Sequence, residues 1–410
     1  MSFLDAAWSA LGNDPAALAG AVPPTIPLSA ALPVGDLVGG AVSAAALAHA
    51  PGTQLHLDPA RVATAVTSER YLRVHGEPWQ AWAEFSGFWQ TADGWVRTHA
   101  NYPHHREALL DVVGGADGFR RLTSLEIEEQ VTARGGVAVA VRSEEEWRAH
   151  PQAAAVARSP FVRLDRVGDA PRRGGVPRVL DLTRVIAGPV ATRTLAFWGA
   201  DVLRIDGPRL PEIEAQHLDT GAGKRSTILD AGSTRFDELL AEADVVVTGY
   251  RPVALERLGL SPEALVERRP GLVVARLSVW GATGPFAARR GFDSIVQAAS
   301  GISWLESADG ATPGALPAQA LDHSAGYLLA AGVATALRRR AEEGGSYLVE
   351  TSLARVAQEL LAAARGPRAA HPAWDPTTVT YGDLTVARPA FPGEWSAPPV
   401  PWGSSEPRWK

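Results

Sequence analysis

The chain has 410 residues, which at about 150 residues per domain predicts two to three domains. Hydrophobic residues make up 46% and charged residues 20%, a balance typical of a globular protein. The net charge of −6 argues against nucleic acid or an anionic membrane surface as a partner, because both require a basic surface. No cysteine is present, which excludes disulfides, thiolate metal sites and cysteine nucleophiles. With no signal-like N-terminus and no apolar run of about 18 residues, we expect a cytoplasmic protein without a membrane span.

Turn residues and composition divide the chain into four parts. Glycine, proline and arginine at 168–177 mark the main break. We expect a partial, degenerate repeat of the large domain over 1–84, a small α+β domain over 85–170, a large domain over 171–365 and an extended C-terminal tail over 366–410.

The large domain alternates short apolar runs with helical patterns. The pattern predicts buried strands at 178–182, 201–205, 244–248, 272–278 and 346–350. It predicts helices at 189–198, 234–243, 254–258, 262–268, 325–340 and 353–364. Such alternation is typical of an α/β fold, with a parallel sheet covered by helices on both faces. Ligands of these sheets bind at the carboxyl ends of the strands.

The N-terminal part repeats this order in shortened form. Asp36 begins a small-residue helix, 53–57 resembles a strand and 59–63 opens another helix. The same order follows Asp322, which predicts an internal duplication.

The turn after the first predicted strand, TRVIAGP at 183–189, is a candidate anion or oxyanion site. Free N–H groups at the start of the following helix would be the donors. An ordinary strand-to-helix turn explains the same residues equally well. The histidines His99, His104 and His105 have no carboxylate at ligand spacing, so we expect a structural or surface role and no metal site.

Basic residues mark a second candidate site. Only two of the 39 basic residues are lysines, and Lys224 in GKRS is the one away from the C-terminal end. A phosphate clamp and plain surface charge are both open interpretations. Arg251 and Arg257 follow the third predicted strand and, with Lys224, would form a basic rim.

Asp322 opens a predicted helix, so it is either an N-cap or a carboxylate nucleophile beside helix N–H groups.

The motifs together resemble family III CoA-transferases, the CaiB/BaiF family. The resemblance covers about 178–364 and rests on RVLDLTRVIAGPVATRTLAFWGADVLRID, AGKRSTILD, ADVVVTGYRPVALERLGL and ALDHSAGYLLAAG. It implies a Rossmann-like large domain, a small α+β domain and, in many members, an interlocked homodimer. It also implies that Asp322 is the catalytic aspartate. Residues that match CoA-binding positions of the family are Ile186, Ala187, Lys224, Tyr250 and Arg257.

Three departures from the family pattern bear on function. Small-domain motifs precede the large domain, so Asp36 is an alternative match to the aspartate. The glycine-rich loop that closes the transferase site is not evident. Gly291-Phe292-Asp293 replaces the GHD motif of the family's racemases, which favours transfer over racemisation.

The resemblance thus implies a CoA-transferase that moves CoA from an acyl-CoA to a carboxylic acid through an aspartyl-CoA thioester. CoA and acyl-CoA would be substrates, with no permanently bound cofactor. The alternatives are an acyl-CoA racemase or epimerase, and a catalytically silent CoA-binding homologue.

Overall fold

A seven-stranded sheet organises the computed structural model, which describes residues 1–366 and 373–410. The strand order in this part of the chain is β6-β12-β11-β10-β7-β8-β9. Neighbouring strands run parallel except β6, which is antiparallel to β12 at one edge. The strands are β6 (Arg163–Gly168), β7 (Arg178–Leu182), β8 (Asp201–Asp206), β9 (Arg225–Ile228), β10 (Val245–Thr248), β11 (Val273–Ser278) and β12 (Ser346–Ser352).

Alternate strand residues enter two different cores because successive side chains point to opposite faces of a sheet. Val179, Val245 and Val273 pack with the helices on one face. Leu180 and Val246 pack with the helices on the other face. The predicted parallel α/β fold with helices on both faces is confirmed, and each strand predicted for the large domain forms.

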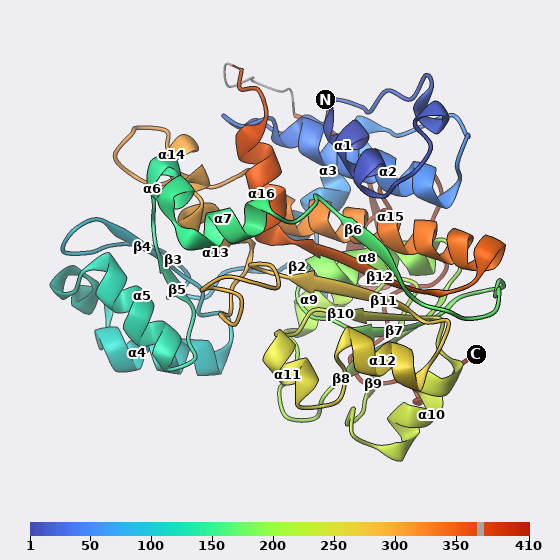
Figure 1. Cartoon of the computed structure of the whole chain (residues 1–410). Coiled ribbons are helices and arrows are strands. Elements are labelled where there is room, and N and C mark those ends of the chain that lie inside the picture. Colours follow the sequence, from blue (N-terminus) through green and yellow to red (C-terminus); the bar gives the residue numbers. More distant parts are fainter. Residues whose placement is uncertain (367–372) are drawn as a thin grey trace.

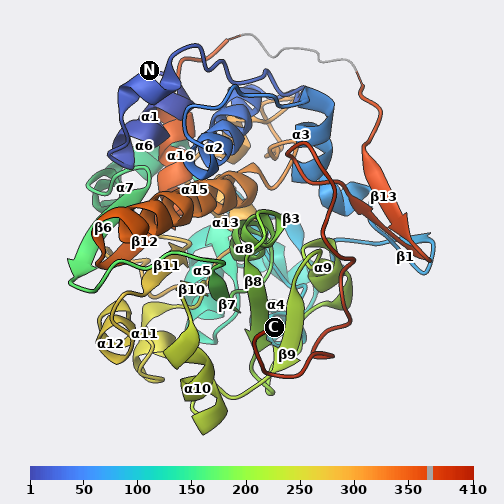
Figure 2. The same cartoon turned by 90° about the vertical axis from the view of Figure 1, so that its right-hand side faces the viewer.

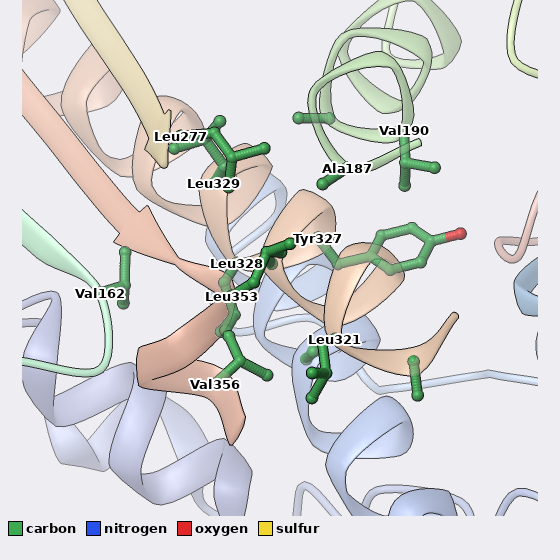
Figure 3. Close-up of a cluster of buried hydrophobic side chains, with 14 of the residues drawn as sticks. Val162, Ala187, Val190, Leu277, Leu321, Tyr327, Leu328, Leu329, Leu353 and Val356 are labelled. Carbon is green, nitrogen blue, oxygen red and sulfur yellow. The ribbon is translucent and has the colours of Figure 1, made fainter. Parts of the chain in front are cut away.

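The helices form layers on either side of this sheet (Figure 1). On one face lie α1 (Phe3–Ala10), α2 (Val34–His49), α8 (Ala187–Phe197), α15 (Ala320–Glu343) and α16 (Leu353–Ala362). On the other face lie α10 (Thr234–Glu242), α11 (Pro252–Glu256) and α12 (Pro262–Arg268). Helix α15 packs against both α2 and α8, so the N-terminal segment completes the large domain's core. Figure 3 shows Ala187 and Val190 of α8 across from Tyr327 of α15 in this core.

The predicted N-terminal repeat of the large domain's element order is correct for its helices and wrong for its strand. Helices α2 and α3 (Pro59–Val66) form, but 53–57 adopts no strand. A strand needs a hydrogen-bonding neighbour, and this segment pairs with none. Leu55 and Leu57 instead pack as half-buried side chains on the large core.

The small domain has its own sheet and core. Strands β3 (Gly87–Gln90), β4 (Trp95–Thr98) and β5 (Ala138–Ala140) pair antiparallel. They pack with α4 (Pro103–Val113), η3 (Ala116–Arg121) and α5 (Ser124–Ala133). The predicted domain boundary at 170 differs from the structure in one respect, because β6 belongs to the large sheet.

Shorter elements connect these bodies. They are η1 (Pro15–Leu18), η2 (Ser68–Arg70), α6 (Glu144–Ala149), α7 (Pro151–Ala157), α9 (Glu214–Asp219), α13 (Asp293–Ala299) and α14 (Ile302–Leu305).

The described part of the tail, 373–410, contains a hairpin that the sequence analysis does not predict. Strands β13 (Thr378–Tyr381) and β14 (Leu384–Ala387) pair, and β14 pairs with β1 (Arg73–Val74), which pairs with β2 (Glu77–Pro78). Figure 2 shows this hairpin near β1 and the remaining tail running past β9. Residues 367–372 of the predicted tail lie outside the described residues.

Among the described residues, we find no helix that is long and apolar enough to cross a membrane.

Candidate functional site

Asp322 lies in the first turn of α15 and is only 6% exposed. The alternative prediction, that Asp322 is the N-cap of this helix, is wrong. The N-cap residue of α15 is Gln319, and its side chain makes no capping hydrogen bond. The carboxyl group of Asp322 is therefore not used to begin the helix.

A second buried carboxyl group lies beside Asp322. Asp293 begins α13 and is fully buried, and its Oδ2 accepts a hydrogen bond from the backbone N–H of Asp322 at 3.0 Å. Gln297 donates its amide to Asp293 Oδ1. Burial raises the pKa of Asp293 to about 6. Burial and the neighbouring Asp293 raise the pKa of Asp322 well above its usual range. Because two like charges repel in a dry site, this pair retains a proton near neutral pH.

A cavity of about 350 Å³ opens above Asp322 at the carboxyl ends of β7, β10 and β11. This is where a parallel α/β sheet binds its ligands. The wall on the small-domain side comes from Tyr102, His104 and His105. The basic side chains of its lining are Arg184, Arg251, Arg289 and Arg290. Four guanidinium groups in one cavity favour a polyanionic ligand.

The turn after β7 borders this cavity through a strained residue. Val185 has φ +71°, a conformation that a β-branched residue rarely adopts. Three residues further on, position 188 requires glycine, because a Cβ there would lie 2.4 Å from the Cβ of Thr183. Ile186 is the N-cap of α8 and Ala187 its first residue, so the unpaired N–H groups of the first turn lie beside the cavity.

A smaller cavity of about 50 Å³ adjoins the first, and the two share Val185, Phe292 and Asp322 in their lining. Ile186 lines it as well. Its other residues are Glu69, Trp79, Ala81, Trp82, His99, Asn101, Gln216, Asp219 and Gln319. Asp322 therefore faces two compartments.

A third cavity of about 220 Å³ lies further along the strand ends. It shares Arg184, Leu210, Tyr250 and Ala254 with the large cavity. Leucine and isoleucine side chains make up much of its remaining wall, so it offers an apolar pocket next to the guanidinium groups.

The structure separates the residues predicted for CoA binding. Ala187 and Tyr250 line the large cavity, and Ile186 lines the small one. Arg257 is exposed at the end of α11 and lines none of these three cavities.

Lys224 is not part of a basic rim. Its Nζ lies 3.0 Å from Asp181 Oδ2 and 3.0 Å from Thr192 Oγ1, and the residue is 3% exposed. Burial lowers the pKa of Lys224 to about 8, although the charge of Asp181 partly opposes this shift. The surface-charge interpretation is wrong, because Asp181 pairs with the ammonium group inside the large domain. The phosphate-clamp interpretation stays a prediction.

Asp36 is exposed in the first turn of α2 and lines none of the three cavities. Of the two aspartates that the duplication makes comparable, only Asp322 lies in the site.

The histidine cluster contributes more to the site than its sequence pattern predicts. His104 and His105 line the large cavity and His99 the small one. Burial lowers the pKa of His105 to about 3, so its ring is neutral. The ring of His99 stacks on Phe292, with centroids 3.7 Å apart. In the described residues, no group of three His, Cys, Asp or Glu side chains is placed to hold a metal ion.

The sheet, the arginine-lined cavity at its strand ends and the buried carboxyl pair define an α/β protein with a candidate ligand site at the usual place for this fold. The model of CoA-transferase family III matches residues 175–373. Residues 175–373 of this chain are thus similar to CoA-transferase family III.

Named relatives show the same similarity. A probable fatty acyl-CoA transferase of Mycobacterium tuberculosis is 32% identical over 202 residues, which are 45% of this chain and 51% of the relative. The alpha subunit of succinyl-CoA–L-malate CoA-transferase of Chloroflexus aurantiacus is 33% identical over 195 residues, 43% of this chain and 45% of the relative. An acyl-CoA transferase of Gibberella moniliformis is 30% identical over 312 residues, 69% of this chain and 53% of the relative.

The chain spans about half the length of these curated relatives. A crystal structure of the Mycobacterium tuberculosis protein Rv3272 aligns with 47% of this chain and 58% of its own, at 33% identity and a TM-score of 0.42.

Proposed function

We propose that this protein transfers CoA from an acyl-CoA to a carboxylic acid, with Asp322 as the nucleophile. One observation carries the proposal: the buried carboxyl group of Asp322 lines an arginine-rich cavity at the carboxyl ends of parallel strands. CoA is a polyanion with a long neutral arm and an adenine ring. The site offers guanidinium groups, a 350 Å³ cavity and an apolar side pocket.

The arrangement of the cavities suggests how CoA binds. The adenine would lie in the third cavity against Tyr250, and its phosphates near Arg184 and Arg251. The pantetheine arm would pass Ala187 and carry the thioester to Asp322. Ile186 would contact the acyl side, and Arg257 would act only on phosphates that extend into solvent.

The chemistry proceeds in two exchanges. Asp322, ionised when the proton of the pair lies on Asp293, attacks the donor thioester carbonyl; the C–S bond breaks, and an aspartyl mixed anhydride and CoA thiolate form. The thiolate attacks the aspartyl carbonyl carbon and expels the donor acid as a carboxylate, which leaves an aspartyl-CoA thioester. The acceptor carboxylate then repeats both steps in reverse, which releases the new acyl-CoA and restores Asp322. No net proton is consumed.

Two features of the site support these steps. The first-turn N–H groups of Ala187 and Gly188 lie beside the cavity and would stabilise the tetrahedral oxyanion. The raised pKa of Asp322 shows a poorly solvated carboxyl group, which is more reactive toward a thioester once it is ionised.

The Asp293–Asp322 pair also favours a second candidate, an acyl-CoA racemase or epimerase. Two carboxyl groups with raised pKa values suit proton transfer to and from the carbon next to the thioester. Such a reaction needs an acid and a base on opposite faces of that carbon. Phe292 provides neither at the position where the family's racemases have histidine.

Mass spectrometry tests the proposal directly. The purified protein is incubated with a panel of acyl-CoAs, with and without hydroxylamine. We expect a CoA adduct, or a hydroxamate, on the peptide that contains Asp322. Asp322→Ala should form no adduct and still bind CoA, whereas the matched variant Asp36→Ala should react as the wild type does.

Other outcomes point to other functions. An adduct on the Asp36 peptide would keep the chemistry and move the site. Solvent deuterium in the acyl group without an adduct would indicate a racemase. CoA binding with neither result would identify a silent CoA-binding homologue.

A further inference from the structure

Two residues that line the small cavity beside Asp322 each have one buried carboxylate oxygen without a hydrogen-bond partner in the described part of the chain. Asp219 Oδ1, at the end of α9, is buried and unpaired, and the residue is 6% exposed. Glu69 Oε2, in η2, is buried and unpaired as well. Both residues line the cavity that also reaches Asp322.

The neighbours of Asp219 and Glu69 make contacts with other atoms and leave these two oxygens unpaired. Ser68 donates its hydroxyl to the other oxygen of Asp219, and Arg193 donates to the backbone carbonyl of Asp219 at 2.7 Å. Arg70 lies 3.9 Å from Glu69 Oε1 and points outward to the carbonyl of Pro317. An unpaired carboxylate in a dry site is costly, so such a group either stays protonated or pairs with a ligand.

The electrostatics of the cavity are consistent with a missing cation. Burial, together with the charge of Asp219, raises the pKa of Glu69 to about 7. Burial likewise raises the pKa of Asp219. A bound cation would reverse both shifts, because it favours the ionised carboxylates.

The size of the cavity limits which cation fits. A volume of about 50 Å³ compares with about 10–15 Å³ needed for one water molecule. The space therefore accepts a primary ammonium group with a short carbon stem and is too small for a bulky organic cation. A group with several N–H donors would also satisfy both unpaired oxygens at once.

We infer that this cavity is a subsite for a primary ammonium group, so the carboxylic acid exchanged at Asp322 is an amino-substituted acid. The ammonium would donate to Asp219 Oδ1 and Glu69 Oε2, while the carboxyl group of the same molecule reaches Asp322. The inference rests on the proposed function, because it specifies the acid that the transferase uses. Gln216 and Gln319 line the same cavity and offer further polar contacts.

Calorimetry with β-alanine and propionate tests the subsite without requiring turnover. The two acids differ by one ammonium group, and we expect wild-type protein to bind β-alanine at least about tenfold more tightly, the strength of one charge-assisted hydrogen bond. Methylammonium chloride should compete with β-alanine. At pH 6.5, binding in two buffers of different ionisation enthalpy should reveal proton release, since Glu69 ionises when the cation arrives.

Glu69→Gln and Asp219→Asn should each remove most of the preference for β-alanine over propionate. Glu77→Gln, which changes an exposed glutamate on β2, should leave the preference intact. Equal wild-type affinity for the two acids, or β-alanine binding without proton release, would overturn the subsite. The outcome of the adduct experiment on Asp322 does not depend on the ammonium subsite, because that experiment detects a covalent adduct with an acyl-CoA and needs no acceptor acid.

Discussion

Lys224 and Asp181 form a buried ion pair that links three elements of the large domain. Asp181 lies in β7, Lys224 precedes β9, and Thr192 of α8 donates its hydroxyl to Asp181 Oδ2. The pKa of Asp181 is lowered because the charges of Lys224 and Arg204 outweigh its burial. The pair therefore holds α8 against the sheet, and α8 carries the turn that borders the site.

Lys224→Met should reduce the free energy of unfolding by about 3–5 kcal/mol, because it leaves the buried charge of Asp181 without a partner. Chemical denaturation at pH 7 measures this loss. The control is Lys410→Met, which changes the exposed lysine at position 410 and should leave stability unchanged. A loss below about 0.5 kcal/mol for Lys224→Met would show that the pair does not support the fold.

Glu69 makes stability depend on pH in a defined direction. Its folded pKa of about 7 exceeds the ordinary value of 4.5, so its contribution is fully present below pH 4.5 and is lost as pH rises through 7. Glu69→Gln removes this loss. The variant should therefore gain about 2 kcal/mol relative to wild type between pH 4.5 and pH 8, less than the full shift because the side chain keeps 19% exposure.

Parallel denaturation curves of wild type and Glu69→Gln at several pH values measure that difference. A gap between the two proteins that stays constant with pH would mean that Glu69 titrates normally in the folded state.

At the scale of elements, the close contact between α15 and α8 positions Asp322 relative to the turn at Val185. A Cβ on Gly326 would lie 2.5 Å from the carbonyl oxygen of Ala187 and 3.0 Å from the Cβ of Val190. The absence of a side chain thus allows the helix that holds the carboxyl group of Asp322 to approach the helix whose first residue, Ala187, lines the cavity.

Gly326→Ala should separate these helices and destabilise the protein by about 1–3 kcal/mol, despite the better helix propensity of alanine. Adduct formation at Asp322 should fall more than CoA binding does. Gly94→Ala is the control, because a Cβ there meets nothing within 4 Å. Unchanged thermal stability and adduct yield in Gly326→Ala would show that the two helices can move apart freely.

At the scale of the whole molecule, segments far apart in sequence build the two compartments around Asp322. Glu69 comes from the N-terminal segment, His99 from the small domain and Asp219 from the large domain. The C-terminal tail forms hydrogen bonds with β9, the strand at one edge of the large sheet. Ser405 donates its backbone N–H to the carbonyl of Ser226 at 2.7 Å, and Trp409 donates its indole N–H to the carbonyl of Leu239.

Deletion of 402–410 should expose the edge strand β9, because the tail supplies backbone hydrogen bonds to it. Hydrogen exchange of the β9 amides should accelerate by at least about tenfold, while the central strand β11 should exchange as in the full chain. Equal protection of β9 in both proteins would show that the tail rests on the sheet without stabilising it.

The sequence by itself determined the α/β class, the strands of the large sheet and the resemblance to CoA-transferase family III, because these depend on local apolar periodicity and on contiguous motifs such as TRVIAGP and ALDHSAGY. It also singled out Asp322 and the turn at Ile186 and Ala187, which share one site. Only the tertiary structure decided that Lys224 forms a buried ion pair with Asp181 and that 53–57 forms no strand. It alone placed Glu69 and Asp219, 150 residues apart in sequence, in one cavity. Burial and pairing depend on residues distant in the chain, and a one-dimensional pattern contains no measure of that distance.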